Sequence, residues 1–274
     1  MRKTLTFILF SVLAMTFVIG QGLAQADKLQ EVKERGTLIA GVKDAVVPFG
    51  FVDEDTNQIV GFDIDVCKYI ADQLGVDLEV KPVTSATRIP KLVQGNVDLV
   101  AATMTHKFSR DDTIDFTLTY FMTGQKILVK KGSGIDSVDE LAGKRVGTAK
   151  GSTSEQNIKK AQPKCKVISY EGYPQAFLAL KQGKVHAVTT DATILLGLKN
   201  SADNPDDYVI AGKYISDEPY GIGVPENESN FRDAVNKALA KMWTSGKYKE
   251  VYNKWFGPDT NYTLPLEWEM EIWP

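Results

Sequence analysis

The sequence predicts an α/β protein made of two related lobes, each a parallel sheet covered by helices on both faces. Short apolar strands alternate with amphipathic helices along most of the chain, which is typical of parallel sheets. A strand-and-helix segment also recurs once at a fixed spacing. With 274 residues, the chain is long enough for two ordinary domains with buried cores.

The composition is that of a folded globular protein and excludes several classes of function. Hydrophobic residues make up 43% of the chain and charged residues 24%, so a disordered chain is not expected. The net charge is −3 and the isoelectric point about 5.6, so nucleic acid is not an expected partner. Two cysteines and two histidines are too few for a disulfide framework or a His-rich metal centre. We therefore expect no metal and no cofactor.

The first 26 residues have the pattern of a secretory signal peptide. Arg2 and Lys3 precede an apolar run from Leu5 to Ile19, and the small-residue ending Ala24-Gln25-Ala26 follows. The run is shorter than the ~20 residues that span a bilayer. Cleavage after Ala26 would leave 248 residues with a net charge of −5. No cysteine lies near this point, which argues against a lipid anchor, so we expect a protein secreted into a periplasm.

Two internal repeats support the division into two lobes. The segment Leu92–Val100 recurs as Leu180–Val188 at an offset of 88, with Gln-Gly and two valines in common. In each copy a helix ends at glycine, which accepts the left-handed conformation, and a strand follows. The strand segments Gly36–Lys43 and Gly143–Lys150 form a second pair in the same order. Two pairs in one order indicate two related units.

Hydrophobic periodicity places the elements in order. The first lobe is expected to have strands near 37–42, 77–82 and 97–102 and helices near 63–74 and 88–94. The second is expected to have strands near 145–149, 166–170 and 185–190 and helices near 153–161, 174–182 and 192–199. Helices near 230–244 and 247–256 form the tail. In helix 63–74 we expect Asp63 as N-cap, Cys67 as a buried thiol and Gly75 as the end.

We expect the tail to pack on the first lobe, which makes that lobe discontinuous. The predicted boundaries are residues 27–122 plus 215–274 for lobe 1 and 123–214 for lobe 2. The chain would cross between the lobes near 122–126 and 211–217.

Polar residues follow the predicted strands and mark a ligand site. Ligands of open parallel sheets bind at the carboxyl ends of the strands. The candidates in the first lobe are Lys43, Ser85, Arg88, Thr103, Thr105 and Arg110, and those in the second are Ser152, Thr153, Tyr173 and Asp191. The offset of 88 puts Thr103 and Asp191 at equivalent strand ends of the two lobes.

This set of side chains suits an α-amino acid. Arg110 can hold a carboxylate with a bidentate fork, and Thr105 can assist it. The Ser152–Glu155 segment has the capping-box pattern and begins a helix whose first N–H groups also suit a carboxylate. Asp191 can pair with the ammonium group. Three cations would thus face one acid.

Three motifs carry a resemblance to a known family. The segments Gly61–Asp65, Arg110–Thr117 and Lys254–Gly257 resemble periplasmic solute-binding proteins of ABC importers for polar amino acids, and the resemblance covers nearly all of residues 35–257. It implies two Rossmann-like lobes joined by two hinge strands, the type II periplasmic-binding-protein fold, which close over a ligand in the cleft. It also implies a free amino acid as ligand, a membrane permease as partner and a monomer.

The resemblance further implies roles for the site residues. Arg110 would bind the α-carboxylate and Asp191 the α-ammonium, with Thr105 and Thr153 assisting. The carbonyl of Thr103 would accept from the ammonium.

The ligand expected from the sequence is glutamate or aspartate. Relatives that bind glutamine or cationic amino acids often carry an acid where this chain has Lys43. The Ser85-x-x-Arg88-Ile-Pro90 run resembles the aspartate/glutamate-binding branch, in which these two residues hold the side-chain carboxylate. Tyr173 departs from that branch, where some members have histidine. Glutamine or another polar amino acid is the alternative ligand.

A dehydratase-like enzyme on the same fold is the alternative of a different class. A hydrolase would need a nucleophile with a histidine and an acid, or paired carboxylates. His106 and His186 are expected to be a surface and a structural residue, and there is no Gly-x-Ser-x-Gly or P-loop motif. We therefore expect a binding protein and not an enzyme.

Overall fold

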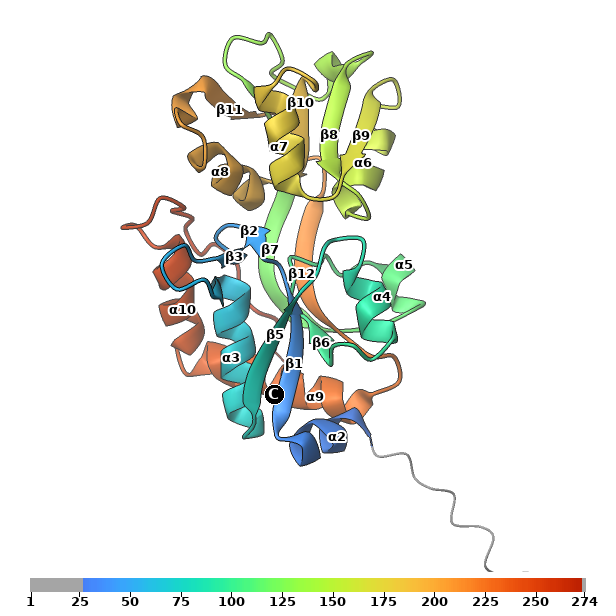
Figure 1. The fold of residues 1–274 in the computed structure, drawn as a ribbon, viewed down its shortest axis with the longest axis vertical. Coiled ribbons are helices and arrows are strands. Elements are labelled where there is room, and N and C mark those ends of the chain that lie inside the picture. Colours follow the sequence, from blue (N-terminus) through green and yellow to red (C-terminus); the bar gives the residue numbers. More distant parts are fainter. Residues whose placement is uncertain (1–26, 273–274) are drawn as a thin grey trace, which may run out of the picture.

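Residues 27–272 are described by the structure, a computed structural model, and they form two α/β lobes stacked along the long axis (Figure 1). The predicted signal peptide, residues 1–26, lies outside the described residues. Among the helices of residues 27–272, none is long and apolar enough to cross a membrane.

Lobe 1 contains the parallel strands expected from the sequence. Its strands are β1 (Thr37–Val42), β5 (Asp77–Pro82) and β6 (Leu99–Val100), with a small antiparallel sheet of β2 (Ala45–Val46), β3 (Gly50–Val52) and β4 (Ile59–Val60). Its helices are α2 (Lys28–Arg35), α3 (Phe62–Leu74), α4 (Arg88–Val93), α5 (Phe108–Asp111), α9 (Ser229–Thr244) and α10 (Lys247–Phe256). The tail helices α9 and α10 pack on α3, so the end of the chain returns to lobe 1 as expected.

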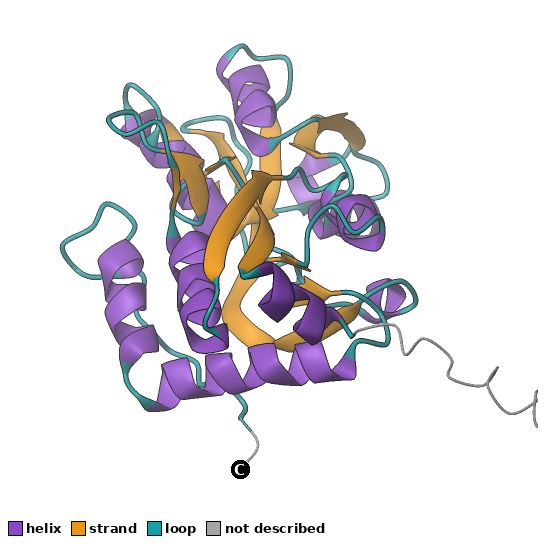
Figure 2. Ribbon diagram, turned by 60° about the horizontal axis from the view of Figure 1, so that its bottom comes forward, coloured by secondary structure: helices purple, strands orange, loops and turns teal. Residues whose placement is uncertain are grey.

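Lobe 2 repeats the arrangement. Its strands are β8 (Arg145–Ala149), β9 (Lys166–Tyr170), β10 (Ala187–Asp191) and β11 (Tyr208–Ala211). Its helices are α6 (Thr153–Ala161), α7 (Tyr173–Lys181) and α8 (Ala192–Asn200), with 3-10 turns η1 (Asp139–Leu141) and η2 (Pro205–Asp207). Helices surround the strands of both lobes (Figure 2). The periodicity therefore predicts most bounds to within two residues.

Two long strands, β7 (Asp115–Lys130) and β12 (Asp217–Val224), connect the lobes. The strand order is β5-β1-β6-β12-β7-β10-β8-β9, and β11 also pairs with β7. β7 pairs with β12 up to Gly124 and then with β10 and β11 from Gln125 onward. Because the partners change at this point, we propose the lobe boundaries at 122 and 215 that the sequence suggested.

Two local predictions are wrong. The strand expected at 97–102 is limited to Leu99–Val100, because the chain then turns through Thr103, whose φ is +48°. Asp63 is not an N-cap, since α3 begins one residue earlier behind Gly61. Its buried carboxylate instead accepts hydrogen bonds from the Thr103 N–H at 3.2 Å and the Tyr120 hydroxyl at 2.8 Å.

The largest apolar cluster continues from lobe 1 into lobe 2. In lobe 1 it contains aromatic rings such as those of Phe49 and Phe121, which pack edge to face with their centroids 4.9 Å apart. In lobe 2 it includes Phe177 and Ile194. Cys67 is buried in this cluster as expected, and both it and Cys165 are free thiols.

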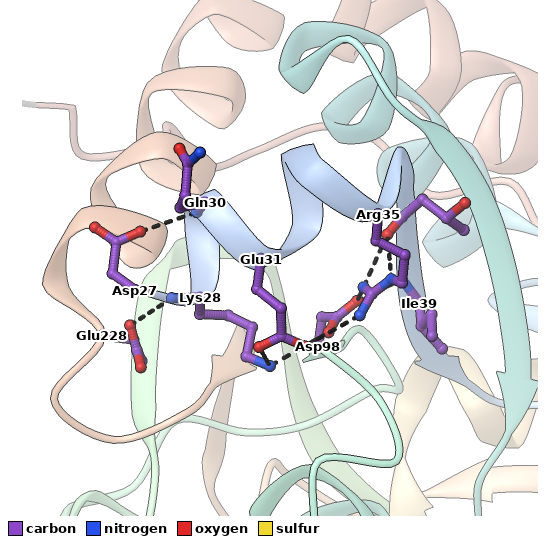
Figure 3. A network of polar contacts seen from close by, with 9 residues as sticks. Asp27, Lys28, Gln30, Glu31, Arg35, Ile39, Asp98 and Glu228 are labelled. Carbon is purple, nitrogen blue, oxygen red and sulfur yellow. Dashed lines mark hydrogen bonds and ion pairs between the residues drawn. The ribbon is translucent and has the colours of Figure 1, made fainter. Parts of the chain in front are cut away.

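The N-terminal helix is tied to the sheet by the buried carboxylate of Asp98 (Figure 3). Asp98 accepts from the Arg35 guanidinium and from the Ile39 N–H, the latter at 2.8 Å. At the start of α2, the Lys28 N–H donates to Glu228 at 2.8 Å. The described chain therefore begins in an anchored helix immediately after the predicted cleavage point.

Candidate functional site

The ten residues predicted to bind ligand lie where the two lobes meet. They lie at the carboxyl ends of β1, β5, β6, β8, β9 and β10, or in the loops and first turns of the helices that follow these strands. Nine are buried, with at most 7% of their surface exposed, and Arg110 is half-buried. The lobes touch here, because a Cβ on Gly151 of lobe 2 would lie 2.8 Å from the Cα of Ala86 of lobe 1. The topology thus brings all ten to one interface.

The three cations come from different strand ends of lobe 1. Lys43 donates to the hydroxyl of Ser85 at 2.9 Å. Arg88 donates through Nη1 to the carbonyls of Ala102 and Thr103, at 2.7 and 3.0 Å. Burial and the neighbouring Arg88 guanidinium hold the pKa of Lys43 well below its usual value.

Arg110 lies on the short helix α5, and its Nη1 donates to the carbonyl of Thr105 at 2.5 Å. Burial, followed by the charge of Arg88, lowers the pKa of Arg110 to about 9. The nearby carboxylates of Glu218 and Asp191 act in the opposite direction. A bound carboxylate would favour the charged guanidinium further.

Asp191 is the acid of lobe 2, at the end of β10. One carboxylate oxygen accepts from the Tyr220 hydroxyl, while Oδ1 is buried without a hydrogen-bond partner. Burial and the charge of Glu218 raise the pKa of Asp191 to about 7. In lobe 1, the buried Nε of Arg88 also lacks a partner. Each unsatisfied buried group costs about 1–3 kcal/mol, so this interface favours a ligand that offers both an acceptor and a donor.

Glu218, on the connecting strand β12, was not predicted as a site residue. It is buried and accepts from the hydroxyls of Thr105 and Thr153 and from Asn157 and Ser216. Both threonines expected to assist a ligand carboxylate thus donate to Glu218 instead. Because one comes from each lobe, their shared partner links the lobes. Their role toward a ligand stays a prediction.

Asp63 is the second acid that the prediction missed. Its Coulombic partners include Lys43 and Arg88, and burial raises its pKa to about 7. With Asp191 and Glu218, three acids therefore accompany the three cations. The expected local excess of positive charge is wrong, because it counted only residues that follow strands. An acid flanked by apolar residues, as in Phe62-Asp63-Ile64, is the signal that could have indicated a buried carboxylate.

The remaining lobe 2 residues surround the first turn of α6. Ser152 is the N-cap as predicted, and its hydroxyl accepts from the Glu155 N–H at 3.2 Å. Glu155 in turn accepts from the Gly151 N–H at 3.1 Å, which removes that donor from any ligand. Burial and the charge of Asp191 raise the pKa of Tyr173. With Lys43 and other residues of both lobes, Tyr173 lines a small cavity of about 100 Å³.

The two histidines lie outside this cluster. The imidazole of His106 is partly exposed, contacts Asp111 at 2.9 Å and stacks on Phe116. His186 accepts through Nδ1 from the Arg145 N–H at 3.1 Å. Within residues 27–272, no three His, Cys, Asp or Glu side chains are grouped to hold a metal ion.

Similarity to known proteins agrees with this geometry. Residues 38–258 match the model of the bacterial extracellular solute-binding proteins, family 3. The ABC transporter glutamine-binding protein of Bacillus subtilis is 40% identical, over 94% of this chain and 99% of its own length. The L-glutamate/L-aspartate-binding protein of Pseudomonas aeruginosa is 31% identical, over 83% of this chain and 79% of its own. The identity to this glutamate/aspartate-binding relative, the branch expected from the sequence, is therefore lower than the identity to the glutamine-binding relative.

A solved structure shows the same fold. An ancestral arginine-binding protein bound to glutamine superposes with a TM-score of 0.78 and 44% identity, over 81% of this chain and 99% of the other. These relatives are amino-acid-binding proteins. The chain belongs to the bacterial extracellular solute-binding proteins of family 3, and its named relatives are amino-acid-binding proteins of ABC import and not enzymes.

Proposed function

We propose that this protein binds glutamine between its lobes and delivers it to the membrane permease of an ABC importer. Arg110 holds the α-carboxylate, and Asp191 together with the carbonyl of Thr103 holds the α-ammonium. The observation that carries the proposal is that two of the three buried, unpartnered side-chain atoms of residues 27–272 lie at this interface, Oδ1 of Asp191 in lobe 2 and Nε of Arg88 in lobe 1, the third being the indole nitrogen of Trp268. An acceptor and a donor in opposite lobes match a ligand that bridges them.

The side chain of the ligand is held by Lys43, Ser85 and Arg88. Lys43 makes one hydrogen bond, to Ser85, and its lowered pKa suits an uncharged amide as partner. Three acids accompany the three cations of the site, so the site can accept a ligand without net charge. The 40% identity to a glutamine-binding protein supports the same choice.

Glutamate is the second candidate, because its γ-carboxylate can pair with the Lys43 ammonium and the Arg88 guanidinium. A γ-carboxylate beside Lys43 and Arg88 would raise the pKa of Lys43 and stabilise its charged form. Glutamate and aspartate, the ligands expected from the sequence, are therefore included in the binding measurements.

We also propose secretion into a periplasm through the signal peptide of residues 1–26, and action as a monomer. The family, whose members are extracellular, supports the first of these. In the closed arrangement the ligand would touch both lobes, and a ligand that contacts both favours closure.

Mass spectrometry of the ligand retained on native purification tests the function. The protein is purified without denaturant, the bound molecule is released by unfolding, and its mass is measured. We expect glutamine, or glutamate if the second candidate is right. Recovery of a different amino acid such as arginine, or of a ligand that lacks an α-amino or α-carboxyl group, would contradict the proposal.

A further inference from the structure

A second contact between the lobes lies beyond the residues that would touch ligand. The loop after β2 of lobe 1 meets helix α8 of lobe 2, and α7 packs on β2 (Figure 1). A Cβ added to Gly197 of α8 would lie 2.2 Å from the carbonyl oxygen of Val47 and 3.1 Å from its carbonyl carbon. The obstacle is backbone, which cannot rotate away as a flexible side chain could. Gly197 is therefore in direct contact with the opposite lobe.

The local helix does not require glycine at this position. Gly197 lies inside α8 and is absent from the residues with positive φ. Glycine in a helix interior is less stable than alanine, because it loses more backbone freedom on folding. Gly151, the other glycine at the lobe contact, differs because its φ is +75° and its backbone favours glycine by itself. The reason for glycine at 197 is thus the approach of the Val47 carbonyl.

Apolar side chains surround this contact on both sides. Val46 precedes the Val47 carbonyl and is 6% exposed, while Ile194 and Leu198 flank Gly197 on α8 and are 1% and 8% exposed. All three belong to the apolar cluster shared by the lobes. Closure would therefore bury apolar surface here, and Gly197 allows the approach.

We infer that Gly197 is a positioning residue for closure, whose missing side chain lets α8 seat on the Val47 carbonyl, so that it sets ligand affinity without touching ligand. The inference rests on the proposed function for the presence of a ligand that closes the lobes. A side chain at 197 leaves an open form unhindered and obstructs only the closed one. Because ligand binds the closed form, the apparent affinity falls by the same factor as the population of that form.

The test compares the parent protein with Gly197→Ala and Gly197→Leu, and with Lys199→Ala on the same helix as control. Affinity and dissociation rate are measured with glutamine or, if the parent does not bind it, with the amino acid retained on native purification. We expect Gly197→Ala to weaken binding by about tenfold or more, mainly through faster dissociation, and Gly197→Leu to weaken it further. Lys199→Ala should match the parent.

A second readout separates obstruction of closure from damage to the fold. The ligand-free Tm of Gly197→Ala should equal that of the parent or exceed it by about 2 °C, since alanine favours the helix. Small-angle scattering should show that ligand shrinks the parent but shrinks Gly197→Ala less. Affinity of Gly197→Ala within twofold of the parent, or equal shrinkage in both, would overturn the inference.

The outcomes also distinguish failure of the inference about Gly197 from failure of the proposed function. A parent that binds no amino acid overturns the function and with it the closing ligand that the inference requires. A parent that binds while Gly197→Ala binds equally well overturns the role of Gly197 alone.

Discussion

Arg110 is half-buried, and one of its guanidinium nitrogens already holds the Thr105 carbonyl. Its remaining donors can form the bidentate contact that a carboxylate prefers. We predict that Arg110→Ala weakens amino-acid binding by about 100-fold, the loss expected when a desolvated carboxylate has no charged partner. Calorimetry checks this, with Arg232→Ala on α9 as the control. Parent-like affinity in Arg110→Ala would show that another residue holds the α-carboxylate.

Asp191 gives the binding a pH dependence of known sign. Its pKa in the ligand-free protein is about 7, and an ammonium partner favours the ionised form. Affinity for glutamine should therefore fall as the pH drops below 7, by up to about tenfold per pH unit. Binding near pH 7 should release protons, which calorimetry in buffers of different ionisation enthalpy detects.

The variant Asp191→Asn separates this residue from the other titrating groups. It should bind more weakly at pH 8 and lose most of the pH dependence. A parent profile that is flat between pH 5 and 8 would mean that Asp191 does not meet the ammonium.

At the scale of elements, the connecting strand β12 carries the acid that links the lobes. Glu218 accepts from Thr105 of lobe 1 and Thr153 of lobe 2, and a glutamine in its place could not accept all four donors. We predict that Glu218→Gln weakens ligand binding by about tenfold, because the closed form loses a charged acceptor. The affinity and the binding rates of the variant and the parent are compared, and Glu226→Gln, at an exposed position, serves as the control. Unchanged affinity would limit Glu218 to a role within the fold.

The elements themselves follow from local patterns in the sequence. Helix α6 and strands β8 and β9 have the predicted bounds, because apolar spacing, the Ser152 cap and flanking glycines all act within a few residues. The roles of Asp63, Glu218 and Gly197 could not be predicted in this way, because they depend on contacts with distant parts of the chain. Apart from Ser216 beside Glu218, their partners, such as Thr103 for Asp63 and Val47 for Gly197, are 40 to 150 residues away in the chain. Such contacts depend on how the two lobes meet.

At the scale of the whole molecule, the fold brings three cations and three acids together where the two lobes meet. The sequence located the cations and Asp191, since Lys43 and Asp191 lie at strand ends and Arg88 and Arg110 lie on the short helices after β5 and β6. Asp63 lies on α3 and Glu218 on the connecting strand, so that search missed them. The ligand expected from the cations alone was acidic. We propose that the three accompanying acids favour a neutral amino acid instead, and the greater identity to the glutamine-binding relative supports this proposal.

The central claim is that the site between the lobes prefers glutamine. Calorimetric titration of ligand-stripped protein with glutamine, glutamate, aspartate and arginine tests it most directly. We predict a micromolar or tighter Kd for glutamine, about −8 kcal/mol or lower, with glutamate next and arginine much weaker because Lys43 and Arg88 oppose a cation. Tighter binding of arginine than of glutamine and glutamate, or no binding of any of the four, would contradict it.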